Sequence, residues 1–211
     1  MRLPFTVREF FEVFARYNAA IWPMQVVLVA LAVLCVLLVH TRFALRSRVV
    51  SWILAGLWLW TGLAYHLAHF AAINPAARLF GALCLGQGIL FAWVGAGGRK
   101  LLLDRPAGVP GLVAWVLIAF AIVVYPYVSW LSGHPYMASP TFGAPCPTTI
   151  FTFGMLWLAR PPLPRYVLAV PLIWSAIGGS AAFALGVRQD LGLVAAGVSG
   201  LWLLLARGHA R

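Results

Sequence analysis

The chain has 211 residues, of which 63% are hydrophobic and only 9% are charged, and its mean hydropathy is +0.94. This composition excludes an ordinary soluble domain, in which about 25% of residues are charged, and it indicates a multi-pass membrane protein. The net charge of +11 does not indicate nucleic-acid binding, because the basic residues lie in short segments beside apolar blocks, where membrane topology explains them.

The first predicted element is an amphipathic helix over residues 5–16. Thr6, with Glu9 three residues later, matches a capping box. The apolar residues that follow share one helical face: Val7, Phe10, Phe11 and Phe14. We expect this helix to lie on the outer membrane surface and to anchor the first crossing, with a lid over a site as the alternative. No signal cleavage site follows, so we expect the segment to be retained.

Seven apolar blocks come next, separated by charged or Pro/Gly-rich breaks. They cover about residues 21–40, 49–70, 76–96, 111–131, 147–159, 166–186 and 191–206. A stretch of about 20 apolar residues is long enough to cross a bilayer as a helix. We therefore predict an all-α fold with one integral membrane domain over residues 1–211, a bundle of seven transmembrane helices preceded by the interfacial helix.

The fifth block is too short to cross as a helix. From Pro147 to Ala159 it has about 13 residues, or about 20 Å of helix, against a hydrocarbon core of about 30 Å. It follows the proline-rich stretch 139–149, in which Cys146 lies between two prolines. Irregular backbone at membrane depth persists only where protein or a water-filled cavity satisfies its polar groups. This segment therefore indicates a broken fifth crossing and a functional site.

The distribution of basic residues predicts the orientation. Ten of them follow the first, third, fifth and seventh blocks: Arg42, Arg46, Arg48, Arg99, Lys100, Arg105, Arg160, Arg165, Arg207 and Arg211. The other side carries five: Arg2, Arg8, Arg16, Arg78 and Arg188. The positive-inside rule then places the N-terminus outside and the C-terminus in the cytoplasm.

Polar residues within the blocks concentrate in the outer half. The candidate ligand-binding residues are Tyr17, Asn18, Gln25, Tyr65, His66, His69, His134, Tyr136, Cys146, Thr148 and Thr149. The same half also holds Ser139, Thr141 and Asp190. Polar side chains in membrane segments usually face a bundle interior or a cavity, so this asymmetry predicts a pocket open to the outside. The alternatives are interface-belt positions for the tyrosines and interhelical hydrogen bonds for the histidines.

Cys146 is the candidate with the most specific chemistry. Pro147 suits the first turn of a helix, and this places Cys146 near the N-cap, where the helix dipole stabilises a thiolate. With His66 and His69, spaced i and i+3, the thiolate would bind a soft or borderline metal ion such as Cu(I), Zn(II) or Hg(II). The alternative is an incidental cysteine in a proline-rich loop. Cys35, Cys84 and Cys146 lie at different depths, so no internal disulfide is expected.

Missing residues and motifs exclude several functions. The only lysine, Lys100, lies in a predicted cytoplasmic loop, so no retinal Schiff base is available despite the seven predicted crossings. No acidic residue lies at mid-membrane depth, and this disfavours a carboxylate-driven proton pump. The chain has no H-E-x-x-H, G-x-S-x-G or phosphate-loop motif, so protease, hydrolase and ATPase chemistries find no support.

Four runs carry a resemblance to a known family. They are Tyr17-Asn-Ala-Ala-Ile-Trp-Pro-Met-Gln25, Tyr65-His-Leu-Ala-His-Phe-Ala-Ala-Ile-Asn-Pro75, Ser139-Pro-Thr-Phe-Gly-Ala-Pro-Cys-Pro-Thr-Thr-Ile-Phe-Thr-Phe-Gly154 and Trp174-Ser-Ala-Ile-Gly-Gly-Ser180. Over almost its full length the chain resembles a bacterial family of multi-pass membrane proteins of unknown function. The resemblance implies a bacterial inner-membrane protein and supplies no activity.

Three functional hypotheses follow. The preferred one is binding or transport of a small ligand or soft metal ion through the outer pocket, at Cys146 with His66, His69 or His134. The second is an intramembrane enzyme, a transferase or hydrolase for a lipid-like substrate, in which Cys146 is the nucleophile and a histidine activates it. The third is a structural membrane subunit whose polar cluster holds helices together. The lipid bilayer is the one expected partner.

Overall fold

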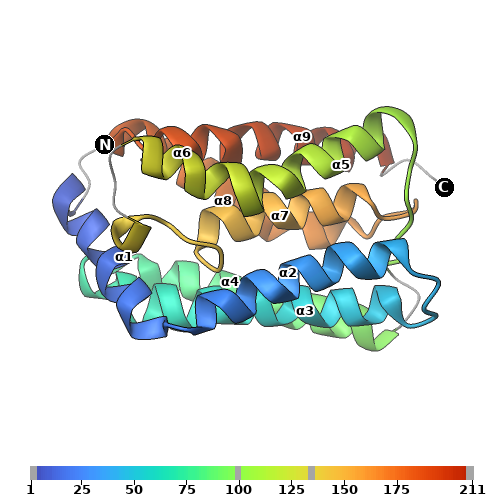
Figure 1. Cartoon of the computed structure of the whole chain (residues 1–211), viewed down its shortest axis with the longest axis horizontal. Coiled ribbons are helices and arrows are strands. Elements are labelled where there is room, and N and C mark those ends of the chain that lie inside the picture. The colour runs from blue at the N-terminus through green and yellow to red at the C-terminus, as the bar shows by residue number, and fades with distance from the viewer. Residues whose placement is uncertain (1–3, 98–100, 133–135, 208–211) are drawn as a thin grey trace.

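The computed structural model describes residues 4–97, 101–132 and 136–207, which form helices and connecting loops without a β-strand (Figure 1). The α-helices of this part are α1 (Val7–Ile21), α2 (Met24–His40), α3 (Arg46–Trp60), α4 (Ala77–Gly97), α5 (Gly108–Ala119), α6 (Tyr125–Leu131), α7 (Pro145–Trp157), α8 (Ala169–Leu185) and α9 (Leu191–Arg207). Short π or 3-10 turns join or extend them: η1 (Thr61–Leu67), η2 (Phe70–Ala72), η3 (Phe120–Val124), η4 (Tyr136–Ala138), η5 (Arg165–Leu168) and η6 (Arg188–Asp190).

Five helical stretches in the described residues are long and apolar enough to cross a membrane. They are Arg46–Ala72, Ala77–Gly97, Gly108–Leu131, Arg165–Leu185 and Arg188–Ala206. Helices α1 and α2 meet at 86° and add a sixth if the pair forms one broken span. The all-α class is confirmed, and five or six of the seven predicted crossings pass this test of length and composition. Helix α7, with 13 residues, is too short to be counted, and α2, with 17, is counted only together with α1.

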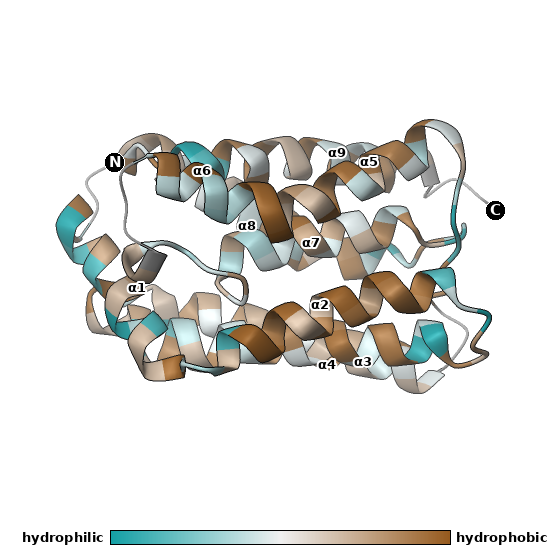
Figure 2. Ribbon diagram, in the orientation of Figure 1, coloured by the Kyte–Doolittle hydropathy of each residue, from teal (hydrophilic) through white to brown (hydrophobic). Residues whose placement is uncertain are grey.

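The helix surfaces carry the pattern expected of a membrane protein. Apolar residues run along the lengths of the helices, while hydrophilic residues gather at the two ends (Figure 2). Large apolar side chains point outward along the sides of the bundle, among them Leu79, Ile89, Val116, Val123, Phe183, Val198 and Trp202. Exposed apolar surface of this extent is unfavourable in water and favourable against lipid.

Helix α7 lies at the centre of the bundle. It contacts α3, α5, α8 and α9 together with the turns η1 and η3 (Figure 1). Twelve of its 13 residues are buried, and Cys146 is the exception. The chain from Ser139 to Ala144 leads into α7 without forming a helix, and it is buried as well. The core therefore contains irregular backbone, whose polar groups need partners from the surrounding helices.

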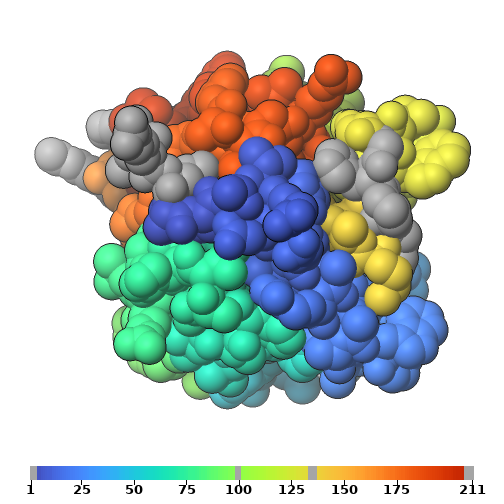
Figure 3. All heavy atoms as spheres, turned by 90° about the vertical axis from the view of Figure 1, so that its left-hand side faces the viewer, coloured from blue at the N-terminus to red at the C-terminus, as the bar shows by residue number. Residues whose placement is uncertain are grey.

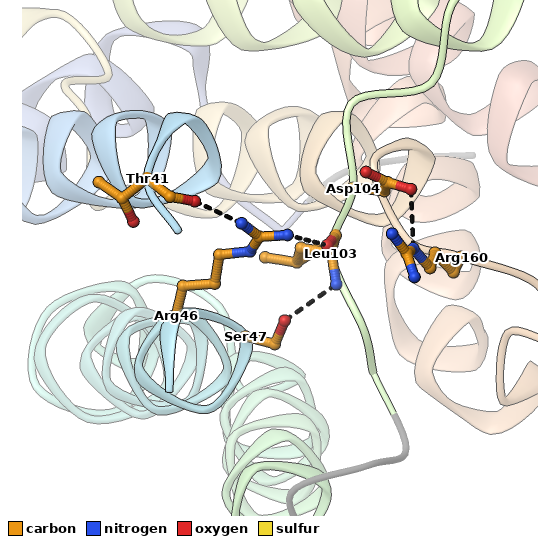
Figure 4. Close-up of polar contacts among 6 residues, drawn as sticks. All are labelled: Thr41, Arg46, Ser47, Leu103, Asp104 and Arg160. Carbon is orange, nitrogen blue, oxygen red and sulfur yellow. Dashed lines mark hydrogen bonds and ion pairs between the residues drawn. The ribbon is translucent and has the colours of Figure 1, made fainter. Parts of the chain in front are cut away.

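The end of the bundle opposite α1 is held by polar contacts of the loop after α4 (Figure 4). The Arg46 guanidinium donates to the carbonyl oxygens of Thr41 and Leu103, and the amide of Leu103 donates to Ser47 Oγ at 3.0 Å. These bonds join the α2–α3 turn to the loop. They satisfy backbone groups that no helix would pair.

The same loop is bound to the chain that follows α7. Asp104 N donates to the Leu158 carbonyl oxygen at 2.8 Å, and Arg160 N donates to the Leu102 carbonyl oxygen at 2.7 Å. Arg160 Nε also lies 2.7 Å from Asp104 Oδ2 (Figure 4). The hydrogen bond from Arg160 holds the pKa of the Asp104 carboxyl below its usual value. Because both side chains are largely exposed, the pair contributes little stability beyond positioning the loop.

Close helix packing explains several glycines, and Gly88 in α4 offers a test. A Cβ atom at Gly88 would lie 2.6 Å from Leu59 Cγ and 3.0 Å from the Ala55 carbonyl oxygen, whereas one at Gly86 would meet nothing within 4 Å. We predict that Gly88→Val lowers the free energy of unfolding by about 1–3 kcal/mol, because it overpacks the α3–α4 contact. Gly86→Val should be neutral or slightly stabilising, since valine has the better helix propensity. Thermal unfolding in detergent measures both, and equal losses would contradict the packing.

Candidate functional site

A cavity of about 310 Å³ lies at the end of the bundle that α1 covers. Figure 3 looks onto this end, where α1 lies across the middle between α8 and the segment from η1 to the start of α4. The cavity is lined from five parts of the fold: α1 with the residues before it, the η1–η2 region, the start of α4, the loop into α7, and α8 with η6. Segments far apart in sequence thus converge on one space.

The walls of the cavity are mainly aromatic. Phe14 stacks on Tyr65 with ring centroids 5.2 Å apart, and Phe10 meets Phe14 edge to face at 5.1 Å. Across the cavity Phe80 meets Trp174 edge to face at 5.5 Å. Further lining rings are Phe5 and Phe70, which pack edge to face at 5.5 Å. These edge-to-face and offset arrangements are the favourable ones for aromatic pairs, so the walls are a packed and largely apolar surface.

Polar groups gather at one position of the wall, around Cys146 and Asp190. Both residues line the cavity, and Cys146 is the one residue of α7 that is not buried. The Cys146 thiol lies beside the Asp190 carboxylate, the Tyr125 hydroxyl and the Trp174 indole. The Tyr125 hydroxyl donates a hydrogen bond to Asp190 Oδ1. The Trp174 Nε1–H, which faces the same thiol, has no acceptor with good hydrogen-bond geometry.

The Asp190 carboxylate is only 4% exposed, and no basic side chain pairs with it in the described residues. Its position follows from the local chain: Gly186, with φ of +68°, ends α8 as a left-handed cap, and η6 then leads directly into α9. The residues described as lining the cavity include neither lysine nor arginine. The cavity therefore presents an acidic group without a cationic partner.

The predicted ligand residues of α1 and α2 mostly bind the irregular segment before α7. Asn18 Nδ2 donates to the carbonyl oxygens of Met137 at 2.7 Å and Ser139 at 2.8 Å. Asn18 Oδ1 accepts from Gln25 Nε2 and from Thr141 Oγ1, each at 2.8 Å. All three amide and hydroxyl side chains are buried. Asn18 and Gln25 therefore do not line the cavity.

A second set of bonds converges on the Gly143 carbonyl oxygen. It accepts from the Tyr17 hydroxyl at 3.3 Å and from Thr61 Oγ1 at 3.2 Å. Trp60 Nε1 donates in turn to the Tyr17 hydroxyl at 2.8 Å. Gly143 has φ of +98°, a conformation open to glycine, and a Cβ there would meet Leu28 Cδ1 at 2.4 Å. Tyr17 is thus a partner of the loop backbone, and it is neither an interface-belt residue nor a cavity residue.

The predicted metal set of Cys146, His66 and His69 does not come together. Within the described ranges, no three His, Cys, Asp or Glu side chains form a group able to hold a metal ion. His69 Nδ1 lies 2.6 Å from the Ala64 carbonyl oxygen of its own helix, which occupies that nitrogen. His66 is buried against Phe80 and Trp174, and neither of its ring nitrogens has a partner. The i, i+3 spacing of an α-helix does not apply to this pair, because His66 belongs to the π-helical turn η1 and His69 follows its end.

The remaining candidates have separate positions. Tyr65 and Cys146 line the cavity, as the sequence predicted. Thr149 Oγ1 donates to the Pro145 carbonyl oxygen at 2.8 Å within α7, and Thr148 Oγ1 is buried without a partner. His134 lies outside the described residues, and the description of Tyr136 extends only to its backbone in η4.

Sequence reasoning missed Asp190, Tyr125 and Trp174 as site residues. The sequence analysis names Asp190 only among the other outer polar residues. One signal could have identified it: Asp190 is an acidic residue at the start of an apolar block. Tyr125 was not among the candidate residues, and it is fully buried. The capping box of Thr6 and Glu9 is confirmed, but α1 continues to Ile21 and buries Phe14 against the bundle. Its residues Phe10 and Phe14 line the cavity.

The loop contacts of Asn18 give a prediction for stability. Asn18→Ala removes its bonds to the Met137 and Ser139 carbonyl oxygens and should lower the free energy of unfolding by about 1–3 kcal/mol, because buried acceptors are left unpaired. Thr141→Val removes the donor to Asn18 Oδ1 at nearly constant volume. Since the residues share one network, the double variant should lose less than the sum of the two single losses. Strictly additive losses in thermal unfolding would contradict the network.

The exposure of Cys146 gives a prediction for reactivity. All three cysteines are free thiols, but Cys35 and Cys84 are buried in the core while Cys146 faces the cavity. We predict that N-ethylmaleimide modifies Cys146 at least about 10-fold faster than the other two, which require opening of the core. Intact-mass measurement follows the reaction, with Cys146→Ser as the control. Modification of Cys35 or Cys84 at the same rate in the folded protein would overturn the assignment.

Comparison with known proteins identifies the family and nothing closer. No curated protein and no solved structure was found to be similar to the chain. One family model matches residues 7–210, which is nearly the whole sequence, and its description is "family of unknown function". The match includes every helix from α1 to α9 and all of the cavity-lining residues except Pro4 and Phe5. The chain therefore belongs to this family of unknown function, DUF6064.

Proposed function

We propose that the protein is a membrane receptor or carrier for a small, largely apolar ligand, which it binds in the cavity beneath α1. One observation carries the proposal: a cavity of about 310 Å³ with aromatic walls converges on a single polar position. Ligand pockets typically measure ~300–1,000 Å³ and combine apolar walls with a few placed polar groups. The proposal replaces the polar, metal-binding pocket expected from sequence, because Tyr17, Asn18 and Gln25 bind the loop before α7 and no metal-binding group of side chains forms in the described residues.

The proposed topology has seven crossings in a bacterial inner membrane. Helix α7 with the irregular chain before it forms the fifth crossing, and α2 forms the first. Arg46, Asp104 and Arg160 lie together at the end opposite α1 (Figure 4). Most basic loop residues belong to this end, so the positive-inside rule makes it cytoplasmic and places α1 and the cavity outside. The ligand then enters from the outer leaflet or the outer water interface.

An enzyme is the second candidate, favoured by the contacts of Cys146. Its thiol lies beside the Asp190 carboxylate and the Tyr125 hydroxyl, which is an arrangement of a nucleophile with groups able to accept and donate a proton. The activating group would be Asp190 instead of the predicted histidine, because His66 bonds to no side chain. This candidate requires a covalent intermediate on Cys146. Ligand binding requires none and survives Cys146→Ser.

The binding proposal is tested with two benzyl compounds of the same shape, uncharged neopentylbenzene and benzyltrimethylammonium. At saturation, at least one should raise the unfolding temperature of the detergent-purified protein, since binding to the folded state alone adds about 2.7 kcal/mol at 100-fold excess over Kd. Ala181→Phe, which fills the cavity, should abolish the rise. Ala176→Phe on the exposed face of α8 is the matched control and should keep it.

One result would contradict ligand binding, and another would favour the enzyme over the receptor or carrier. No stabilisation by either compound, or equal stabilisation in Ala181→Phe, would show that the cavity is not a binding site. A mass increase on Cys146 from membrane-derived acyl or prenyl groups, absent in Cys146→Ser, would favour the enzyme.

A further inference from the structure

We infer that the ligand of this cavity is an organic cation, an ammonium group carried on an apolar body, and that Asp190 is its anchor. The inference rests on the proposed binding function and names the chemical class of the ligand. It is carried by three observations in the described residues: the unpaired carboxylate of Asp190, the aromatic rings around it, and the absence of basic groups from the cavity wall.

The first step concerns the unused acceptor capacity of Asp190. A carboxylate has about four lone-pair positions on two oxygens. The Tyr125 hydroxyl donates to Oδ1, and the Cys146 thiol lies alongside. These two donors are uncharged and leave acceptor positions on a group that lines the cavity. A buried carboxylate without a cation is costly, and a ligand cation in the cavity offsets that cost.

The second step concerns the rings. Four aromatic residues line the same space as Asp190: Phe14, Tyr65, Phe80 and Trp174. Trp174 reaches the Cys146 thiol, which in turn contacts Asp190, so one ring lies close to the anchor. The faces of aromatic rings attract cations, tryptophan most strongly, and cages of aromatic rings bind quaternary ammonium groups. An inorganic cation is not favoured, because the wall offers too few oxygen ligands.

The third step excludes ligands of other charge. The basic residues at this end of the described chain, Arg8, Arg16, Arg78 and Arg188, are all exposed, and none lines the cavity. An anionic ligand would therefore meet Asp190 without compensation. An uncharged apolar ligand fits the walls but leaves the carboxylate unpaired, so it should bind more weakly than a cation of equal shape.

The test compares ligands in the wild-type protein, where no variant has to fold. Affinities of benzyltrimethylammonium and of its uncharged isostere neopentylbenzene are measured by competition with maleimide modification of Cys146. We expect the cation to bind at least about 10-fold more tightly, because the isostere lacks both the ion pair and the cation–π attraction. Phenylacetate, an anion of related shape, should give no protection.

Variants then test whether Asp190 is the residue that recognises the positive charge of the ligand. Asp190→Asn should reduce the affinity for the cation at least 10-fold and leave that for the isostere unchanged, while Asp104→Asn at the opposite end should change neither. Phe10→Leu keeps an apolar wall but removes one aromatic ring. It should lower the affinity for the cation more than the affinity for the isostere. If Asp190→Asn does not fold, the wild-type comparison decides alone.

Equal affinities of cation and isostere, or a cation affinity unchanged in Asp190→Asn, would overturn the inference and leave the binding proposal intact. Failure of both compounds to protect Cys146 would overturn the binding proposal itself. The two failures are therefore distinguishable.

Discussion

The structure depends on one constraint, which is that a chain of 13 helical residues occupies the centre of an apolar bundle. The buried chain from Ser139 to Ala144, which leads into α7, runs without helical hydrogen bonds, so its polar groups need other partners. Its carbonyl oxygens are satisfied by Asn18, Tyr17 and Thr61 instead. Helix α1 is thereby fixed to the bundle, because the first two of these residues belong to it.

The cavity is a consequence of this arrangement. The loop before α7 keeps α1 at the end of the bundle, and the aromatic face of α1 then closes a space that α4, α8 and η6 leave open (Figure 3). Cys146 marks the boundary between the two regions: every other residue of α7 is buried in the core, and this thiol faces the cavity. The same segment that organises the core therefore presents the reactive group.

The two ends of the molecule use their polar residues differently. At the end with the basic loops, Arg46 binds the Leu103 carbonyl oxygen, and Arg160 forms an exposed ion pair with Asp104 (Figure 4). At the α1 end, Asp190 is buried with only uncharged neighbours. Ion pairs in water contribute little, whereas an unpaired buried charge is expensive. Polar residues at the first end are explained by loop structure alone, and Asp190 is the exception that points to a ligand.

The sequence by itself determined the all-helical class, the boundaries of most apolar helices and the capped N-terminal helix. These properties follow from composition, capping pattern and segment length, which act over a few neighbouring residues. Only the tertiary structure decided which polar residues meet. Asn18 and Gln25 belong to the loop network, His69 bonds to the Ala64 carbonyl oxygen, and Tyr125 and Trp174 join Cys146 beside Asp190. The reason is physical: partners more than 60 residues apart, such as Tyr125 and Asp190, are selected by helix packing, on which local sequence patterns carry no information.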